Sequence, residues 1–170
     1  MLISRSPCAR VLRLDPADEN DYQEFLNRVV PRLAELQVKR GLWNEEGALE
    51  ASKAVYAGLL PQGLATPKLW LRTLVDDGSN ARVGEVLYKV EELGGKVDFL
   101  IEWIWIDPQH RRRGYATQAL LQLENEARRV GADRTRLFVW MDNPEAASLY
   151  SGLGYTTFSM GMSKSLNRDP

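Results

Sequence analysis

The most restrictive feature of the sequence is a dense run of large apolar residues, KVDFLIEWIWI at positions 96–106, that leads into a basic turn. Such a density of apolar side chains predicts a central strand, covered on both faces of a sheet. The residues after the turn recur at helical intervals and predict a helix that ends at Gly131. Its buried face is expected to comprise Ala116, Ala119, Leu120, Leu123 and Ala127.

The basic turn, DPQHRRRGYA, places Arg111, Arg112, Arg113 and Gly114 between this strand and the helix. Two interpretations are open: a solvated turn, or a nest for an anionic group. The unpaired amides and the dipole at a helix N-terminus attract phosphates, Gly114 permits a close backbone approach, and the small Ala116 leaves room. The turn lacks the endings of a nucleotide P-loop and of a dinucleotide fingerprint, so nucleoside triphosphates and NAD are not expected.

Composition bounds the remaining possibilities. The 170 residues, 44% of them hydrophobic, suffice for one α/β core, so we expect a single domain over residues 1–170 with a loose start at residues 1–8. Lysine and arginine number 22 against 23 acidic residues, and this balance leaves no broad basic surface for unspecific binding of nucleic acids or anionic membranes. Any basic site is therefore expected to be local.

Few residues are available for metal or redox chemistry. Cys8 is the only cysteine and His110 the only histidine, which speaks against an intrachain disulfide and a metal cluster. The first ten residues contain no apolar leader, and no apolar run approaches the roughly 20 residues that span a bilayer. We therefore expect a soluble, cytoplasmic protein without a metal.

The rest of the chain alternates between strand and helix patterns. Asp15 is the expected N-cap of a first amphipathic helix with Pro16 at its first position, and Asn44 is the expected N-cap of a second helix. The turn DDGSN joins two β-rich runs into an antiparallel hairpin. The predicted strands are residues 9–14, 68–75, 82–93, 96–106, 135–141 and 155–166, the last as a strand or hairpin, and a short helix is predicted within residues 143–154.

A second constellation lies further along the chain, in DNPEAASLYSGLGY. Asn143 follows a predicted strand, Pro144 fits the first position of a helix and Gly154 fits its end. Ala146 and Tyr150 lie one helical turn apart. Asn143 is explained equally well as a helix cap, and Tyr150 as a core aromatic, so a chemical role for either stays open at this point.

Together the two constellations resemble those of the GNAT superfamily of N-acetyltransferases, in its bacterial form. RRRGYA fits the family pattern Arg/Gln-x-x-Gly-x-Gly/Ala, and NPEAASLYSGLGY fits its later pattern Asn-x-x-Ala-x-x-Leu-Tyr-x-x-x-Gly-aromatic. The resemblance is firm over residues 83–166, whereas residues 10–75 fit only the family's order of elements. The matching positions are Arg111, Gly114, Ala116, Asn143, Ala146, Leu149, Tyr150, Gly154 and Tyr155.

The resemblance implies an α/β GNAT fold with a central mixed, mostly antiparallel sheet of six to seven strands and about four flanking helices. Two parallel strands would splay apart, here the strand ending at Ile106 and the strand from Leu137 to Met141, and bind acetyl-CoA between them. Backbone groups of the first strand would pair with the pantetheine arm, as would Asn143, and amides of the arginine turn would bind the diphosphate. The implied cofactor residues are Ile104, Trp105, Ile106, Arg111, Arg112, Arg113, Gly114, Tyr115, Ala116, Thr117, Asn143 and Tyr150.

The implied reaction is direct attack of a substrate amine on the thioester, which requires a base, a donor to the carbonyl oxygen and an acid for the thiolate. By resemblance Tyr150 is the acid. An amide near Ile104 is a candidate for the donor, and Glu102 is the candidate base, two residues before Ile104 on the same strand face. A structural ion pair of Glu102, or a relay through water, stays open. His110 has a suitable intrinsic pKa, but its place in the turn favours a surface role.

The acceptor implied by the resemblance is a small-molecule amine or a peptide N-terminus, bound between the first two helices and the hairpin. Trp43, Tyr22 and Tyr56 are candidates to line that pocket, although core packing explains Tyr22 and Tyr56 as well. A CoA-binding module without turnover shares every cofactor residue and stays open, as does the choice between monomer and homodimer. RNA binding through the arginines is not expected, because no aromatic stacking platform accompanies them.

Overall fold

The computed structural model describes residues 11–164 and residue 166. The chain divides into two compact units, residues 1–138 and residues 139–170. The predicted loose start at residues 1–8 lies outside the described residues. Within residues 11–164, no helix is both long enough and apolar enough to cross a membrane.

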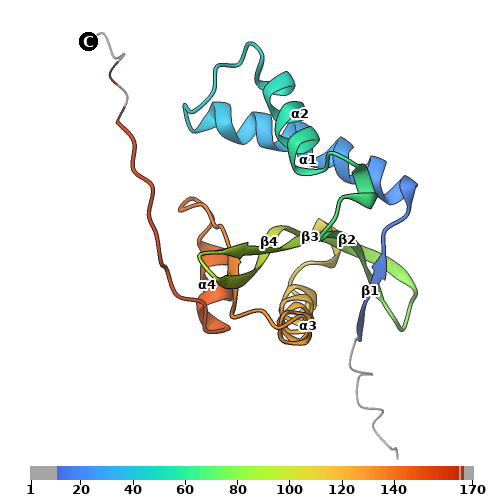
Figure 1. The fold of residues 1–170 in the computed structure, drawn as a ribbon. Coiled ribbons are helices and arrows are strands. Elements are labelled where there is room, and N and C mark those ends of the chain that lie inside the picture. The colour runs from blue at the N-terminus through green and yellow to red at the C-terminus, as the bar shows by residue number, and fades with distance from the viewer. Residues whose placement is uncertain (1–10, 165, 167–170) are drawn as a thin grey trace, which may run out of the picture. The chain divides into compact units, whose positions relative to one another are not determined.

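A five-stranded sheet forms the centre of the first unit (Figure 1). The strands follow one another across the sheet in the order of the sequence. Each of the first four runs antiparallel to its neighbours among them, and the fifth runs parallel to the fourth. The strands are β1 (Leu12–Pro16), β2 (Leu69–Asp76), β3 (Ala81–Leu93), β4 (Lys96–Ile106) and β5 (Arg134–Leu137).

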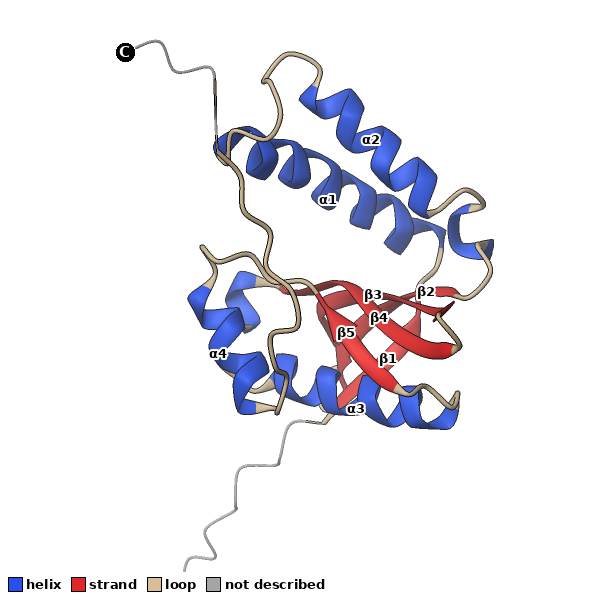
Figure 2. Ribbon diagram, turned by 60° about the vertical axis from the view of Figure 1, so that its left-hand side comes forward, coloured by secondary structure: helices blue, strands red, loops and turns tan. Residues whose placement is uncertain are grey.

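Helices cover both faces of this sheet. Helices α1 (Glu19–Lys39) and α2 (Ala48–Leu59) lie on one face, and α3 (Tyr115–Arg129) lies on the other (Figure 2). Two short 3₁₀ turns, η1 (Gly63–Ala65) and η2 (Pro108–His110), precede β2 and α3. The central strand predicted from apolar density is therefore confirmed as β4, which lies inside the sheet between β3 and β5.

The predicted start of the first helix is wrong. Asp18, not Asp15, is its N-cap: the Asp18 side chain accepts a hydrogen bond from the amide of Asp21 at 2.8 Å, and the Asp21 side chain accepts one from the amide of Asp18 at 3.2 Å. This reciprocal capping box satisfies two amides, so the later start is favoured. Asp15 lies in β1, where it pairs with Arg13, and Pro16 ends that strand.

The predicted cap of the second helix is also wrong. The residue before α2 is Gly47, whose φ of 82° is left-handed, and no side chain caps the helix there. Glycine adopts this conformation without the strain that a Cβ would cause, whereas Asn44 lies three residues too early.

The predicted hairpin is confirmed as β2 and β3, which pair from Leu69 opposite Lys89 to Asp76 opposite Ala81. β4 then pairs with β3 over its whole length. The pairing shifts register between Leu87 and Tyr88, and the extra residue on β4 is Glu102. A bulge of this kind redirects a side chain and increases the local twist.

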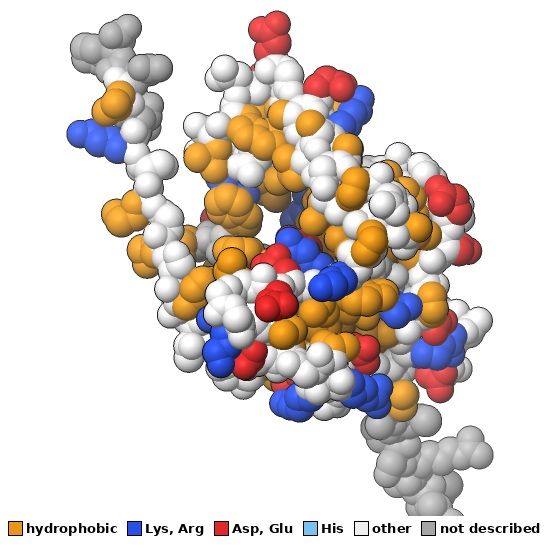
Figure 3. Space-filling view, viewed as in Figure 1, with side chains coloured by type: hydrophobic (Ala, Val, Ile, Leu, Met, Phe, Trp, Pro, Cys, Tyr) orange, Lys and Arg blue, Asp and Glu red, His pale blue; other side chains and the backbone are white. Residues whose placement is uncertain are grey.

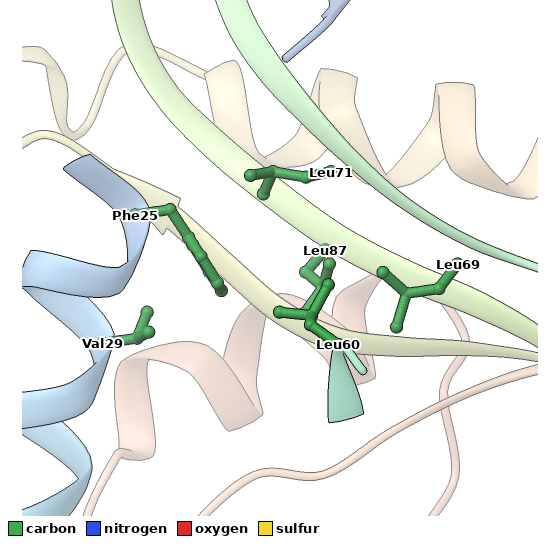
Figure 4. Packing of buried hydrophobic residues seen from close by; sticks show 6 residues of the cluster. All are labelled: Phe25, Val29, Leu60, Leu69, Leu71 and Leu87. Atoms are coloured by element: carbon green, nitrogen blue, oxygen red, sulfur yellow. The ribbon is translucent and has the colours of Figure 1, made fainter. Parts of the chain in front are cut away.

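An apolar cluster joins α1 and α2 to the sheet (Figure 4). Phe25, Val29 and Leu87 are completely buried in it. Burial of such side chains stabilises the fold by about 1.5–3 kcal/mol each. Six buried residues form the cluster: Phe25 and Val29 of α1, Leu60 after α2, Leu69 and Leu71 of β2, and Leu87 of β3.

A buried carboxylate anchors β5 to the start of β4. Asp98 is fully buried and accepts hydrogen bonds from Arg134 Nε at 2.6 Å, from Arg134 Nη2 at 3.0 Å and from Arg136 Nη1 at 2.5 Å. The hydrogen bonds from Arg134 and Arg136 outweigh the effect of burial and lower the pKa of Asp98. The pairing with β5 covers only the stretch from Asp98 to Ile101.

The strand expected over residues 135–141 is therefore shorter than predicted, and it is not wholly buried. Regular pairing ends at Leu137, and Phe138 is 67% exposed. The apolar run FVWM predicted a buried strand, but a strand also needs a neighbour along its edge, and the described residues provide β5 with only β4.

The described part of the second unit contains one helix, α4 (Pro144–Gly152), where the sequence predicted it. The final strand predicted at residues 155–166 is wrong for the described part, residues 155–164 and 166, which form no strand. The described sheet accordingly has five strands rather than six to seven. Phe158, Met160 and Met162 alternate with smaller residues as in a strand, yet all three are exposed and the segment pairs with no described strand.

Gly84 should be intolerant of any side chain. A Cβ at this position would lie 2.1 Å from the backbone oxygen of Trp105 in the neighbouring strand. We expect Gly84→Ala to lower the free energy of unfolding by about 2–4 kcal/mol, because the backbone of β3 or β4 must shift. Urea unfolding followed by circular dichroism measures the change.

Gly58→Ala is the matched control for that prediction. Gly58 lies inside α2, and a Cβ there meets no atom within 4 Å. Alanine should raise the free energy of unfolding by about 0.5–1 kcal/mol, since it is the better helix former. Equal effects of the two substitutions would show that the close approach of β3 and β4 is not what excludes a side chain at Gly84.

Asp98→Asn should destabilise the protein by about 2 kcal/mol near neutral pH, because buried hydrogen bonds from two arginines lose their charged acceptor. The lowered pKa of Asp98 means that its contribution is present above about pH 4 and is lost as the pH falls through the folded-state value. Stability of the variant should therefore fall less steeply than that of the wild type in acid. Parallel acid profiles would contradict the assignment.

Candidate functional site

The carboxyl half of β4 has a strand neighbour on one side only. Residues 98–101 pair with β5, but from Glu102 to Ile106 the only described partner of β4 is β3. Strands that separate in this way expose main-chain N–H and C=O groups along the open edge. An extended ligand can pair with such an edge as a further strand would.

The register of β3 and β4 determines which backbone groups are open. The amide of Asp107 donates to the carbonyl of Val83 at 2.9 Å. Bonded and non-bonded pairs alternate in an antiparallel ladder, so Trp105 forms a bonded pair with Glu85, and Ile104 and Ile106 direct their backbone groups away from β3.

The turn after β4 has the geometry of an anion nest. Arg112 has a φ of 58° and Gly114 a φ of 83°, so two left-handed residues occur within three positions. Gly114 is the N-cap of α3, has no side chain to cap the helix, and no acidic residue occupies the first turn. Successive amides in such a turn converge on one point and favour a negative charge.

Most backbone amides of this turn have no backbone partner among the described residues. The first backbone bond of α3 runs from the amide of Gln118 to the carbonyl of Gly114 at 3.1 Å. Within residues 11–164, no backbone acceptor is recorded for the amides of Arg112, Arg113, Gly114, Ala116 and Thr117. The side chains of Arg112 and Arg113 are exposed. A diphosphate placed here would therefore replace water rather than protein contacts.

Arg111 helps to hold this turn in place. Its Nε donates to the carbonyl of Ile106 at 3.0 Å, and its guanidinium lies 4.6 Å from the centre of the Trp105 ring. The guanidinium of Arg32 in α1 lies 5.0 Å from the same ring. Arg111 thus fixes the turn to the end of β4, and the carbonyl of Ile106 is already occupied.

Glu102 lies at the bulge of β4 and shares a face with Lys89. Its Oε1 is 2.8 Å from Lys89 Nζ, and its side chain is 21% exposed. On β3, Lys89 stands opposite Leu100 and the fully buried Val86 stands opposite Ile104. Lys89 and Val86 are three residues apart, so their side chains point to opposite faces of the sheet. The bulge reverses the alternation of side chains, so Glu102 does not share a face with Ile104 as predicted. The ion pair left open by the sequence does form.

His110 and Tyr115 lie together beside the turn. Their rings meet edge to face with centres 6.5 Å apart, and Tyr115 is buried. His110 is partly buried and packs against the start of α3. His110 is thus packed against the fold rather than being the freely exposed surface residue that the sequence favoured.

The second unit carries the other two predicted residues. Asn143 Oδ1 accepts a hydrogen bond from the amide of Ala146 at 3.2 Å, so the capping role is confirmed. Tyr150 is 9% exposed, and its ring centre lies 5.9 Å from that of Tyr155. Burial, together with Tyr155, raises the pKa of Tyr150, which keeps the phenol protonated at neutral pH.

A buried ion network on β3 was not predicted. Glu85 is 1% exposed, and its carboxylate pairs with Arg28 of α1, with Arg82 at 2.8 Å and with the indole N–H of Trp103 at 3.2 Å. Its signal in the sequence is a glutamate at an inward position of the apolar run RVGEVLY. The network fixes Trp103 beside Glu102 and compensates the buried charge.

The three aromatic residues proposed to line an acceptor pocket differ in their surroundings. Tyr22 and Tyr56 both pack against the apolar cluster of Figure 4, and Tyr56 meets Phe25 edge to face at 5.8 Å. Core packing therefore accounts for both, as the sequence allowed. Trp43 is partly buried after α1, and its role stays a prediction.

The charged side chains and the potential metal ligands of the described residues do not indicate a different kind of site. On the face shown in Figure 3, lysine and arginine side chains are interspersed with acidic ones rather than gathered into one basic field. Among residues 11–164 and 166, no group of three or more histidine, cysteine or acidic side chains could hold a metal ion.

The model of the acetyltransferase (GNAT) family matches residues 39–155, which is more than half of the chain. The chain belongs to the GNAT acetyltransferase family. GNAT acetyltransferases use acetyl-CoA as the co-substrate.

Two Bacillus subtilis proteins resemble this GNAT chain over almost their whole length. The uncharacterised N-acetyltransferase YycN is 30% identical over 173 residues, covering 91% of this chain and 99% of YycN. The uncharacterised N-acetyltransferase YdgE is 27% identical over 153 residues, covering 90% and 97%.

Solved structures show the same fold. The crystal structure of YycN superimposes with a TM-score of 0.85 at 31% identity, covering 93% of this chain and 100% of that one. A tetramutant of the BH1408 protein from Bacillus halodurans has a TM-score of 0.67 at 17% identity, with 92% and 99% covered. The second likeness supports the fold alone.

A negative charge in the first turn of α3 should stabilise the helix but weaken cofactor binding. Asp at position 117 favours the helix by about 0.3–1 kcal/mol through the dipole. The same charge repels a diphosphate. We expect Thr117→Asp to weaken CoA binding by about tenfold or more while thermal stability is unchanged or raised.

Thr117→Asn is the control, because it has nearly the shape of aspartate without its charge. Its affinity for CoA, measured by isothermal titration calorimetry, should stay within about threefold of the wild type. Equal CoA affinity of the Asp and Asn variants would place the diphosphate away from this turn.

Proposed function

We propose that the protein is an N-acetyltransferase that transfers the acetyl group of acetyl-CoA directly to a primary amine within a ternary complex. The observation that carries the proposal is that two adjoining sets of backbone groups lack a partner among the described residues. The open edge of β4 leads through Arg111 into the uncapped N-terminus of α3. An extended pantetheine arm ending in a diphosphate has the matching sequence of polar groups.

Each part of the cofactor has a proposed place. The pantetheine arm pairs with the backbone of Ile104 and the amide of Ile106, because the ladder with β3 already uses Trp105. The diphosphate binds the amides between Arg112 and Thr117, including those of Arg113, Gly114, Tyr115 and Ala116. Asn143 meets the arm near the thiol and also caps α4.

The proposed chemistry is a balanced acyl transfer. The amine nitrogen forms a bond to the thioester carbon, the C–S bond breaks, and the products are the acetylated amine and free CoA thiol. Glu102, directly or through water, takes the proton that leaves the ammonium. Tyr150 donates its phenol proton to the thiolate, and burial, which raises the pKa of Tyr150, keeps that proton in place at neutral pH. The second proton lost from the attacking nitrogen then returns the phenolate of Tyr150 to the phenol, directly or through water.

The proposed acceptor is a small-molecule amine or a peptide N-terminus that approaches the face of the sheet covered by α1 and α2. Glu102 and Trp103 lie on that face at the bulge of β4. Buried Glu85 and its arginines hold Trp103 in place there, so the wall of the pocket is rigid before an acceptor arrives.

Release of CoA thiol from acetyl-CoA, measured across a panel of primary amines, tests the proposal. We expect turnover with at least one amine, and we expect Tyr150→Phe to lower kcat by about 10²-fold while CoA affinity stays within about threefold. Tyr155→Phe removes the neighbouring phenol and should keep kcat within about threefold. CoA binding without turnover of any amine would instead favour a binding module.

A further inference from the structure

A groove lies between β1 and α3, which are neighbours on the face of the sheet that α3 covers (Figure 2). Its volume is about 660 Å³, within the roughly 300–1,000 Å³ that is typical of pockets for small molecules. The proposed acceptor approaches the opposite face, so this groove is separate from the proposed transferase site. Among the residues that line the groove are Leu14, Arg72, Asp77, Tyr88, Leu123 and Glu126.

Arg72 contributes a positive charge to the groove. Leu71, the preceding residue of β2, packs into the apolar cluster beside α1 and α2, so the alternation of side chains directs Arg72 to the α3 face. Arg72 is partly buried there, and it forms neither an ion pair nor a hydrogen bond with any residue that the structure describes. Removing a charge from water without supplying a partner is costly, so this position favours an anionic ligand.

The two carboxylates that line the groove already have cations. Arg13 Nη1 lies 2.7 Å from Asp77 Oδ1, and Arg129 Nη1 lies 3.6 Å from Glu126 Oε2. Of the three arginines in the lining, Arg72 is therefore the one to which the described residues offer no carboxylate. One uncompensated positive charge matches a carboxylate. A phosphate group, with a charge of about −1.5 to −2, would be repelled more strongly by Asp77 and Glu126.

β1 is an edge strand, and its hydrogen bonds show which of its backbone groups are open. The carbonyl of Val11 accepts a hydrogen bond from the amide of Asp77 at 2.8 Å, and the amide of Ala17 donates to the carbonyl of Leu71 at 3.3 Å. The direction of these groups alternates along an antiparallel ladder, so the odd-numbered residues of β1 bond to β2 and the even-numbered ones point away from it.

Of the even-numbered residues, Leu14 alone keeps both an amide and a carbonyl open. The amide of Leu12 donates to Gln118 Oε1 at 3.1 Å, and the carbonyl of Leu12 accepts from Gln122 Nε2 at 2.7 Å, so α3 closes that position. Pro16 has no amide hydrogen. No described residue pairs with the outward backbone groups of Leu14. Because the open edge is so short, it suits a single amide group better than an added peptide strand.

The base of the groove is apolar and well packed. Tyr88 is buried, and its ring stacks between those of Trp70 and Phe99, with ring centres 5.4 Å and 4.7 Å away. Leu123 of α3 is buried as well. An apolar group of a ligand that lies over these side chains would exclude water from them, which favours binding.

We propose that this groove binds a small carboxylate that also carries an amide and an apolar group, which is the chemistry of an acylated amino acid. Arg72 binds the carboxylate, the backbone of Leu14 pairs with the amide, and the apolar group lies over Tyr88 and Leu123. A guanidinium can donate two parallel hydrogen bonds to a carboxylate, which fixes its orientation. The inference does not rest on the proposed acetyl transfer, because it uses none of the residues assigned to that reaction.

Titration of the full chain with N-acetylphenylalanine, followed by ¹⁵N NMR, tests the site. We expect saturable shifts of the Leu14 amide and Arg72 Nε signals, with a dissociation constant of about 1 mM or lower. The neutral N-acetylphenylalanine amide lacks the charge and should bind at least about tenfold more weakly. Unchanged Leu14 and Arg72 signals at about 10 mM acid would overturn the proposal. Tighter binding of phenyl phosphate would contradict the match to a single negative charge.

Arg72→Gln should weaken binding of the acid by about tenfold or more. The thermal midpoint should not fall, since Arg72 has no partner among the described residues. Arg128→Gln is the matched control, because Arg128 pairs with Glu124 of α3 outside the groove, and its affinity for the acid should stay within about threefold. Leu14→Pro removes only an outward amide hydrogen of an edge strand, so it should weaken binding by about threefold or more in a folded protein.

The same titration distinguishes the groove from the amide nest after β4, which also attracts negative charge. Shifts confined to Gly114 and Ala116 that persist in Arg72→Gln would assign the acid to that turn and reject the groove. Shifts at Leu14 and Arg72 in a protein that acetylates no amine would support the groove, while the proposed function would fail on its own test.

Discussion

The proposed site depends on the early end of β5. Among the described residues, the carboxyl half of β4 therefore has no strand partner on that side. Asp98 ties Arg134 and Arg136 of β5 to the first half of β4, so parallel pairing is strong where the two strands begin. Beyond Ile101 that pairing ends, while β3 continues to support β4 as far as Ile106. The result is a rigid strand with one open edge, which suits an extended ligand better than a flexible loop would.

The turn after β4 continues this edge into the proposed site of the diphosphate. Arg111 donates a hydrogen bond to the carbonyl of Ile106, and its guanidinium lies over the Trp105 ring. These contacts stabilise the turn. The left-handed residues Arg112 and Gly114 then direct backbone amides outward. Anion binding in this account comes chiefly from the main chain and the helix dipole.

The sequence predicted the elements that local patterns determine. The apolar density of residues 96–106 indicated the central strand, the turn DDGSN indicated the hairpin, and the two motifs indicated the turn at Gly114 and the helix at Tyr150. The cap of α1 was misplaced because Asp15 and Asp18 offer the same local signal, and only pairing with β2 assigns Asp15 to a strand. The missing final strand has a related cause, since alternation of side chains predicts a strand but cannot supply its partner.

The interactions around Glu102 could not be predicted, because they depend on a register shift. Alternation along an unbroken strand places Glu102 and Ile104 on one face, and the bulge opposite Leu87 and Tyr88 reverses that relation. The same shift brings Glu102 to Lys89, on the face where Glu85 holds Trp103. The ion pair between the proposed base and Lys89 thus depends on one extra residue in β4.

The most direct test of the central claim is amide hydrogen exchange of β4, followed by NMR with and without CoA. The account predicts that CoA slows exchange at Ile104 and Ile106 at least about tenfold, and far less at Trp105, whose backbone groups already pair with β3. If CoA binds and the exchange of Ile104 stays unchanged, the pantetheine arm does not lie along β4, and the proposed site is wrong.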